Sequence, residues 1–272
     1  MLMPKSIPLI PALALFGAIV LASPALAQSA GRALLATFCE AANIKGKTCT
    51  RAKDYPNAPK RGCDVTLTGD HYRGKFTASG SPVMVESYES GCEAHATDNG
   101  GSVLFEQAGG GWVFRGYEPG MQAGDCVTIA KDDRQDLLVC LSGHMGQGIM
   151  ESGVALMKFT AKSANRIGLT VDMLLRAEDS TGAFGANTVT CKERPPKYFE
   201  LDKPRAGPRP MTVSVEASWA DAATFRTACG KGFPKPAEAV ADLVPGDAWV
   251  PDDQVKRGRI VIDLATRKVT TQ

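Results

Sequence analysis

Histidine is the side chain best suited to proton transfer near neutral pH, and this chain contains three. His95 follows Cys92 in a Cys-x-x-His string that can bind a metal ion. However, we expect Cys92 to be oxidised, and c-type haem attachment would need a second cysteine in the motif. His144, within the glycine-rich residues 142–148, is a candidate general base. His71 is expected at the start of a strand, on the face of a sheet.

The familiar catalytic and cofactor signatures do not occur in the sequence. It lacks the G-x-S-x-G nucleophile elbow, the P-loop, the dinucleotide fingerprint and H-E-x-x-H. We therefore predict no catalytic residue, no cofactor-binding residue and no metal site, and we do not favour an enzyme. A secreted hydrolase that combines a loop histidine with nearby carboxylates remains the first alternative.

Three carboxylates gather at Asp132, Asp133 and Asp136, in a polar stretch between two apolar runs. The string from Asp132 to Val139 resembles the end of an integrin-type FG-GAP repeat. In that family an aspartate-rich loop binds calcium between two strands of a propeller blade. This chain lacks the glycine and the full D-x-D-x-D-G spacing of such a loop, and the string does not recur. A calcium-stabilised β module is the second alternative, beside a plain polar hairpin turn.

All of the cysteines follow the first 27 residues, and their even number favours four structural disulfides in an oxidising compartment. If Ala130 faces Asp136 across a hairpin, Cys126 faces Cys140 and the two can form a bridge; the alternative is that both point into the core and pair elsewhere. The eight candidates are Cys39, Cys49, Cys63, Cys92, Cys126, Cys140, Cys191 and Cys229. Cys191 is the most natural partner for Cys229.

Residues 1–27 have the form of a signal peptide. Lys5 precedes an apolar core over residues 10–22, and Ala25-Leu26-Ala27 is an A-x-A cleavage site. We expect a periplasmic or secreted protein with no membrane insertion after cleavage. The formal charge of +2 gives no electrostatic case for nucleic acid as a partner.

Strand and turn signals organise the chain around residues 91–148. Short β-branched and aromatic runs flank a reversal at residues 108–111, and a second pair of runs flanks the turn at residues 131–135. Outside this stretch we expect a helix over residues 29–43, a polar loop over 50–62, a hairpin of strands 63–68 and 71–77 turning at Gly69-Asp70, and a strand over 83–88. We expect a glycine-rich loop over 142–148, a strand over 153–159 and a wholly buried strand over 167–175.

The domain organisation follows from composition. After the signal peptide we expect a disulfide-stapled β-rich domain over residues 28–194, a Pro-rich linker or loop over 195–210, and a small α+β part over 211–272. In this last part, Ser218 would cap a helix, residues 236–243 would form another, and residues 259–264 and 268–270 would form a hairpin. The fold class is mainly β, an antiparallel meander in the form of a sandwich, barrel or propeller.

These features favour a non-catalytic binding or envelope-associated module. Its partner would be an envelope protein, a polymer or a small ligand. The loops at residues 94–101 and 142–148 are the expected contact regions, because rigid scaffolds present their binding residues on such loops.

Overall fold

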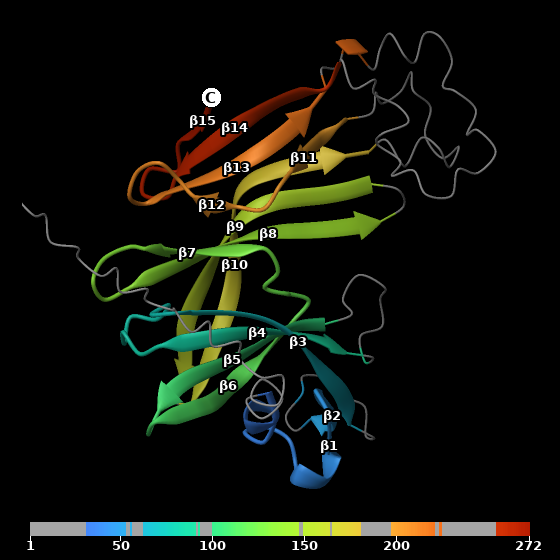
Figure 1. Ribbon diagram of the computed structural model, residues 1–272, viewed down its shortest axis with the longest axis vertical. Coiled ribbons are helices and arrows are strands. Elements are labelled where there is room, and N and C mark those ends of the chain that lie inside the picture. Colours follow the sequence, from blue (N-terminus) through green and yellow to red (C-terminus); the bar gives the residue numbers. More distant parts are fainter. Residues whose placement is uncertain are drawn as a thin grey trace, which may run out of the picture.

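The computed structural model describes residues 31–52, 55, 62–90, 92, 100–146, 149–163, 165–180, 197–220, 223–224 and 254–272. Within these residues, antiparallel strands form three sheets, and helix is confined to short segments (Figure 1). None of the three sheets closes on itself in this part of the chain, so the architecture is sandwich-like rather than a barrel. The prediction of a mainly antiparallel β fold is confirmed.

The sheets follow one another along the chain. The first sheet contains β1 (Ile44–Lys45), β2 (Thr48–Ala52), β3 (Cys63–Gly74), β4 (Val83–Ser90), β5 (Gly100–Ala108) and β6 (Gly111–Pro119) in that order. The middle sheet has the order β10 (Arg166–Asp179), β9 (Ile149–Ser163), β8 (Asp136–Gly146) and β7 (Cys126–Ala130). The C-terminal sheet has the order β11 (Phe199–Leu201), β13 (Thr212–Trp219), β14 (Lys256–Asp263) and β15 (Val269–Thr271), with β12 (Arg205–Ala206) beside β13.

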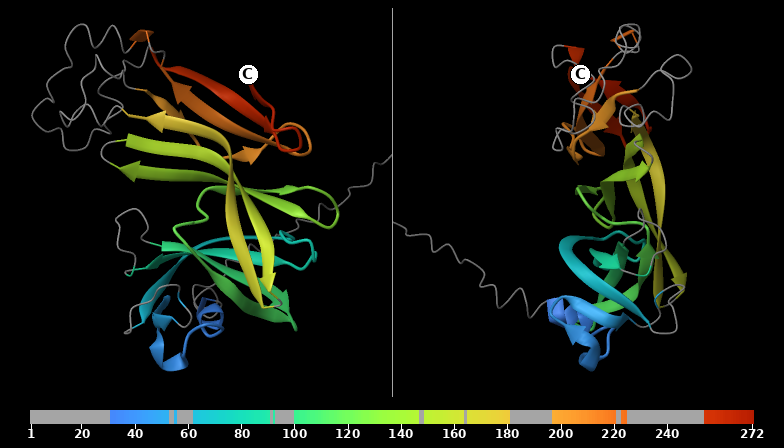
Figure 2. Two further views of the ribbon diagram at one scale, coloured as in Figure 1. Left: turned by 180° about the vertical axis from the view of Figure 1, so that it is seen from behind. Right: turned by 90° about the vertical axis from the view of Figure 1, so that its right-hand side faces the viewer.

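The middle sheet is packed on both faces. Successive residues of a strand point to opposite faces, so Leu138 packs against the first sheet and Val139 against the C-terminal sheet. Met157 and Leu156 of β9 divide in the same way. The sheets therefore lie as successive layers, and the long β9–β10 hairpin reaches across to lie beside the first sheet (Figures 1 and 2).

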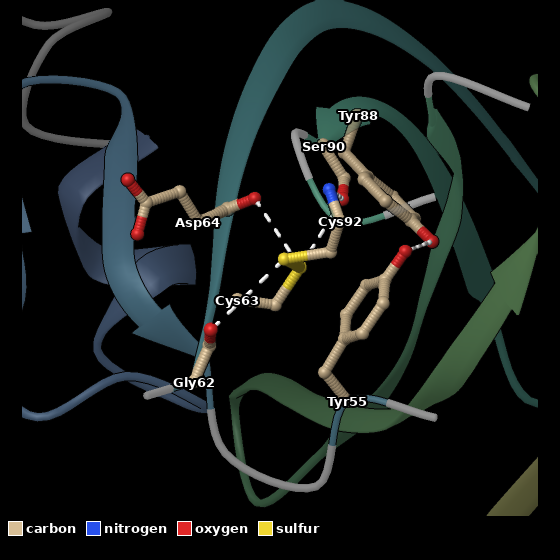
Figure 3. Close-up of a disulfide and its surroundings, with 7 residues drawn as sticks. All are labelled: Tyr55, Gly62, Cys63, Asp64, Tyr88, Ser90 and Cys92. Carbon is tan, nitrogen blue, oxygen red and sulfur yellow. Dashed lines mark hydrogen bonds between the residues drawn. A yellow bond between two sulfur atoms is a disulfide. The ribbon is translucent and has the colours of Figure 1, made fainter. Parts of the chain in front are cut away.

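A third core covers the other face of the first sheet. Phe38, from the N-terminal segment, packs against Phe114 and Tyr117 with ring centroids 5.4 and 5.7 Å away. Beside them, the hydroxyls of Tyr55 and Tyr88 lie 3.0 Å apart, next to the disulfide that involves Cys63 (Figure 3). Burial raises the pKa of Tyr88, so its hydroxyl stays protonated as this aromatic core requires.

Both central hairpins agree with the sequence. β5 and β6 pair from Ala108 and Gly111, and Gly109 and Gly110 between them have φ of +59° and +83°. Two positive φ values are what a tight hairpin turn requires, and glycine adopts them without strain. β7 and β8 pair in the predicted register, with Ala130 opposite Asp136.

The predicted hairpin at Gly69-Asp70 is wrong, because β3 is one strand that runs past this point. Its pairing with β4 shifts between Leu67 and His71, so the three intervening residues bulge outward. Gly69 has φ of +99° and donates its N–H to Glu86 Oε1 at 3.1 Å. A glycine with positive φ permits a bulge as readily as a turn, and here it forms a bulge.

The predicted N-terminal helix is too long. Residues 31–35 are helical, but Glu40 is extended, with ψ of 139°, and the chain then forms a short 3-10 turn, η1 (Ala41–Asn43). Gly46 lies in the turn between β1 and β2, with φ of +59°. β2 also occupies residues 50–52 of the predicted polar loop.

The glycine-rich loop predicted at residues 142–148 is wrong for residues 142–146, which continue β8. Ser142 pairs with Gly153, and the register runs without interruption to Gly146 opposite Ile149. The expectation of a wholly buried strand over 167–175 is also wrong, because 39% of Val171 is exposed.

The C-terminal segments are more extended than predicted. Ser218 lies within β13, opposite Arg257, and therefore does not cap a helix. The helical Ala223 and Thr224 are described, whereas residues 236–243 lie outside the described part. Within the Pro-rich residues 195–210, β11 and β12 both pair with β13, and the predicted terminal hairpin is present as β14 and β15.

Candidate functional site: a groove beside β8

Disulfides account for the six cysteines that the structure describes. The pairs are Cys39–Cys49, Cys63–Cys92 and Cys126–Cys140, with Cα atoms 5.8, 5.8 and 3.9 Å apart. The last pair is the cross-strand bridge that the hairpin register predicted, while Cys191 and Cys229 lie outside the described residues. Three disulfides in a β-rich fold fit a protein that works outside the cytoplasm.

Of the three histidines, the structure describes the side chain of His71 alone. His71 Nδ1 lies 3.6 Å from Glu86 Oε2, with 44% of the His71 side chain exposed. The Glu86 side chain is only 5% exposed, and burial raises its pKa against the opposing effects of His71 and of the Gly69 N–H. His144 lies in β8 opposite Glu151, and His95 lies outside the described residues.

Two of the three aspartates at the β7–β8 turn accept hydrogen bonds from backbone N–H groups. Asp132 Oδ1 accepts hydrogen bonds from the N–H groups of Arg134 and Gln135, both at 2.8 Å, and these bonds lower the pKa of Asp132. Asp136 Oδ2 accepts the N–H of Lys75 at 2.8 Å, which joins the turn to the first sheet. Across the described residues, no three His, Cys, Asp or Glu side chains are placed to hold a metal ion.

A groove of about 610 Å³ lies between the residue 120–125 connector and the middle sheet. Two regions predicted to bind meet here: Gly100 belongs to the stretch 94–101, and Ser142 and Gly143 belong to 142–148. Leu141 of β8 and four further segments complete the wall. These segments supply Gly120, Met121, Gln122, Gly124 and Asp125 of the connector, Met150, Ser152 and Met157 of β9, Val171 of β10, and Glu200 and Leu201 of β11.

A second hollow of about 400 Å³ continues the groove. It shares Ser142, Gly143 and Ser152 with the first and extends along β10 towards β11. At its far end, Lys197 Nζ donates to Glu178 Oε2 at 2.7 Å. The backbone N–H of Ser180 donates to the backbone O of Lys197 at 3.0 Å. We call the two hollows together the β8 groove.

One edge of β8 opens towards this groove. β7 begins at Cys126, opposite Cys140, and the next residue of β8, Leu141, donates its N–H to Asp125 O at 3.1 Å. Beyond Leu141, β8 pairs with β9 on one side and with no described strand on the other. Backbone groups of alternate residues point to the same edge, so those of Gly143 point where those of Leu141 do.

The charge of the groove is negative. Four carboxylates and two cations line its two parts, which leaves a formal charge of −2. They are Asp125, Glu151, Glu178, Glu200, Arg176 and Lys197.

Sequence reasoning missed the methionines that line the groove. Met121, Met150, Met157 and Met173 come from three separate elements, and nothing in their spacing shows that they converge. It also missed the burial of Glu86, although its position directly after the apolar residues 83–85 was a signal that could have been read.

Comparison with known proteins adds no relative. No family model matches the chain, no curated protein matches its sequence, and no solved structure matches its fold. Among the described residues, no helix has the length and apolar character needed to cross a membrane. The function must therefore be argued from the groove itself.

Proposed function

We propose that this protein is an exported, non-catalytic binding module that holds an extended polypeptide segment of an envelope protein in the β8 groove. The observation that carries the proposal is the position of the open β8 edge on the wall of a long groove, where Gly143 faces no described strand. Such an edge offers N–H and C=O groups that an added strand can pair with.

The walls suit a chain of mixed side chains. Methionine is flexible and polarizable, so Met121, Met150 and Met157 can adapt to different apolar groups. Ser142 and Ser152, the small side chains shared by both hollows, leave room for a backbone to pass. An added strand of five residues would extend about 16 Å, at roughly 3.3 Å per residue.

Charge selects among possible segments. The formal charge of −2 along the groove favours a segment that carries lysine or arginine, and like charges would repel an acidic one. The proposed ligand is therefore an extended, partly apolar segment with at least one basic residue.

A matched pair of valine variants tests the proposal. Val171, in the groove, is 39% exposed, and Val113, on β6 outside it, is 37% exposed. We would measure binding of the oxidised protein to an array of short random peptides, for wild type, Val171→Lys and Val113→Lys. We expect bound peptides to be enriched in basic and apolar residues, and Val171→Lys to abolish their binding while Val113→Lys leaves it unchanged.

Two results would overturn the proposal. One is an array with no peptide bound above background. The other is equal binding by both valine variants, which would place any peptide site elsewhere on the molecule.

A further inference from the structure

A separate pocket of about 490 Å³ lies between the first sheet and the β9–β10 hairpin. It shares no lining residue with the β8 groove. Thr77 and Ser79 precede β4, Glu106 and Arg115 lie on the β5–β6 hairpin, and Arg166 begins β10. The pocket thus draws polar side chains from distant parts of the chain.

Arg115 is the central group of this pocket. Only 14% of its side chain is exposed, and its Nε donates to Glu106 Oε2 at 2.8 Å. A guanidinium carries five N–H donors, and this bond uses one of them. Within the described part of the chain, no acceptor is found for its two terminal nitrogens.

The terminal nitrogens of Arg115 are reached by solvent through the pocket, since neither belongs to the buried side-chain atoms that lack a hydrogen-bond partner. They are therefore accessible to a ligand oxygen, and a hydrogen bond from a charged donor is stronger than one between neutral groups. The Glu106 carboxylate fixes the direction of the Arg115 fork by holding Nε, so the remaining donors are oriented before any ligand arrives. The pocket supplies space for an acceptor beside these donors.

The other lining groups favour an anion. Arg166 adds a second guanidinium, so two cations oppose the single carboxylate of Glu106 and the formal charge is +1. Thr77 Oγ1 and Ser79 Oγ share a hydrogen bond of 2.8 Å, which uses one of their two O–H donors and leaves the other to donate to an oxygen. Phe159 forms a firm wall, since its ring stacks on Phe76 at 4.9 Å.

We propose that this pocket binds a tetrahedral oxyanion, a phosphate or sulfate group, held by the terminal nitrogens of Arg115 and by Arg166. Guanidinium forks match the geometry of such oxygens, and a tetrahedral group presents enough acceptors for both arginines. The Glu106 carboxylate neutralises part of the charge, so binding is reversible and moderate.

Calorimetric titration with inorganic phosphate, inorganic sulfate and glycerol phosphate tests the proposal, with sodium chloride at matched ionic strength as the blank. Saturable binding of inorganic phosphate or sulfate would identify the free ion as the ligand. Glycerol phosphate binding more tightly than inorganic phosphate identifies an ester as the natural ligand. Both outcomes support an oxyanion site.

Three variants locate the site. Arg115→Lys keeps the charge beside Glu106 but loses the fork, and we expect about a tenfold loss of phosphate affinity. Arg166→Gln alters an exposed residue, so folding is retained, and we expect a similar loss. Arg205→Gln, with 63% of its side chain exposed on β12, is the control and should bind as wild type does.

The proposal is overturned by an absence of saturable binding for all three anions. It is also overturned if Arg166→Gln and Arg205→Gln bind phosphate equally, because the anion then lies outside this pocket. Neither result bears on peptide binding in the β8 groove.

Discussion

Removing the Cys126–Cys140 bridge should destabilise the protein by about 3 kcal/mol, a value set by the length of the loop that the bridge closes. The two cysteines have a sequence separation of 14. Closing a loop of this size lowers the entropy of the unfolded chain, which is equivalent to about 3 kcal/mol of stability at 25 °C. The double variant Cys126→Ala with Cys140→Ala should lose slightly more, because Cys140 is fully buried between the first and middle sheets.

Urea unfolding of the oxidised wild type and the double variant measures this loss. The free energy of unfolding should fall by about 3 kcal/mol, and the denaturant slope should rise because the unfolded chain opens further. The matched control removes Cys39–Cys49, whose separation of 10 gives a nearly equal entropy term. The control should leave peptide binding intact, whereas loss of Cys126–Cys140 should weaken it, since Asp125 and Leu141 beside the bridge line the groove.

A loss below about 1 kcal/mol for the double variant would refute the reasoning, because restriction of the unfolded chain could then not be the main effect of the bridge. Equal weakening of peptide binding by both disulfide variants would contradict a specific role of the Cys126–Cys140 bridge in shaping the β8 groove.

Three further variants test other parts of the structure. Burial raises the pKa of Glu86 in the folded protein above its value of 4.5 in the unfolded chain. The protonated Glu86 side chain therefore contributes stability below pH 4.5, and this contribution is lost as the pH rises through the folded pKa. The variant Glu86→Gln keeps an oxygen that accepts the Gly69 N–H but has no charge to bury. In urea titrations, its free energy of unfolding relative to wild type should therefore increase from pH 4.5 towards neutral. Parallel pH profiles of the two proteins would contradict this. Gly101→Ala would place a Cβ 2.3 Å from Glu118 O and should lower the free energy of unfolding by about 3 kcal/mol. The control Gly111→Ala, whose Cβ would have nothing within 4 Å, should change that free energy by less than about 0.5 kcal/mol. Similar losses for both variants would refute the steric argument. Hydrogen bonds from Arg267 and Lys158 lower the pKa of Asp172 below its value of 3.8 in the unfolded chain. The stability contributed by the ionised Asp172 is therefore present above pH 3.8 and is lost as the pH falls through the folded pKa. In thermal unfolding, Asp172→Asn should weaken the loss of stability at acid pH, and an unchanged acid profile would contradict this.

Local chemistry explains what the sequence could predict. The Gly109-Gly110 turn and the register that places Cys126 opposite Cys140 depend on neighbours along the chain, so pattern and spacing suffice to find them. The error at Gly69 has a local cause too, because a glycine with positive φ serves both hairpins and bulges, and only the partner strand distinguishes them.

The candidate sites were beyond local reasoning. Met121 and Met150 meet in the groove because the connector after β6 passes β8 and β9, and Arg115 meets Arg166 because the β9–β10 hairpin reaches back to the first sheet. Such meetings depend on how sheets stack, which no short window of sequence encodes. The continuation of β8 through Gly146 was missed for a different reason, since its pairing with β9 in one hairpin outweighs the low strand preference of the glycines.

The two-faced packing of the middle sheet has a consequence for how the protein matures. A slip of β8 by one residue would exchange Leu138 and Val139 between the two cores and so disrupt both at once. Cys126 faces Cys140 only in the correct register, so oxidation during maturation fixes that register covalently. A hairpin slipped by one residue would not place the two thiols opposite each other, so the bridge is compatible only with the register in which both cores are packed.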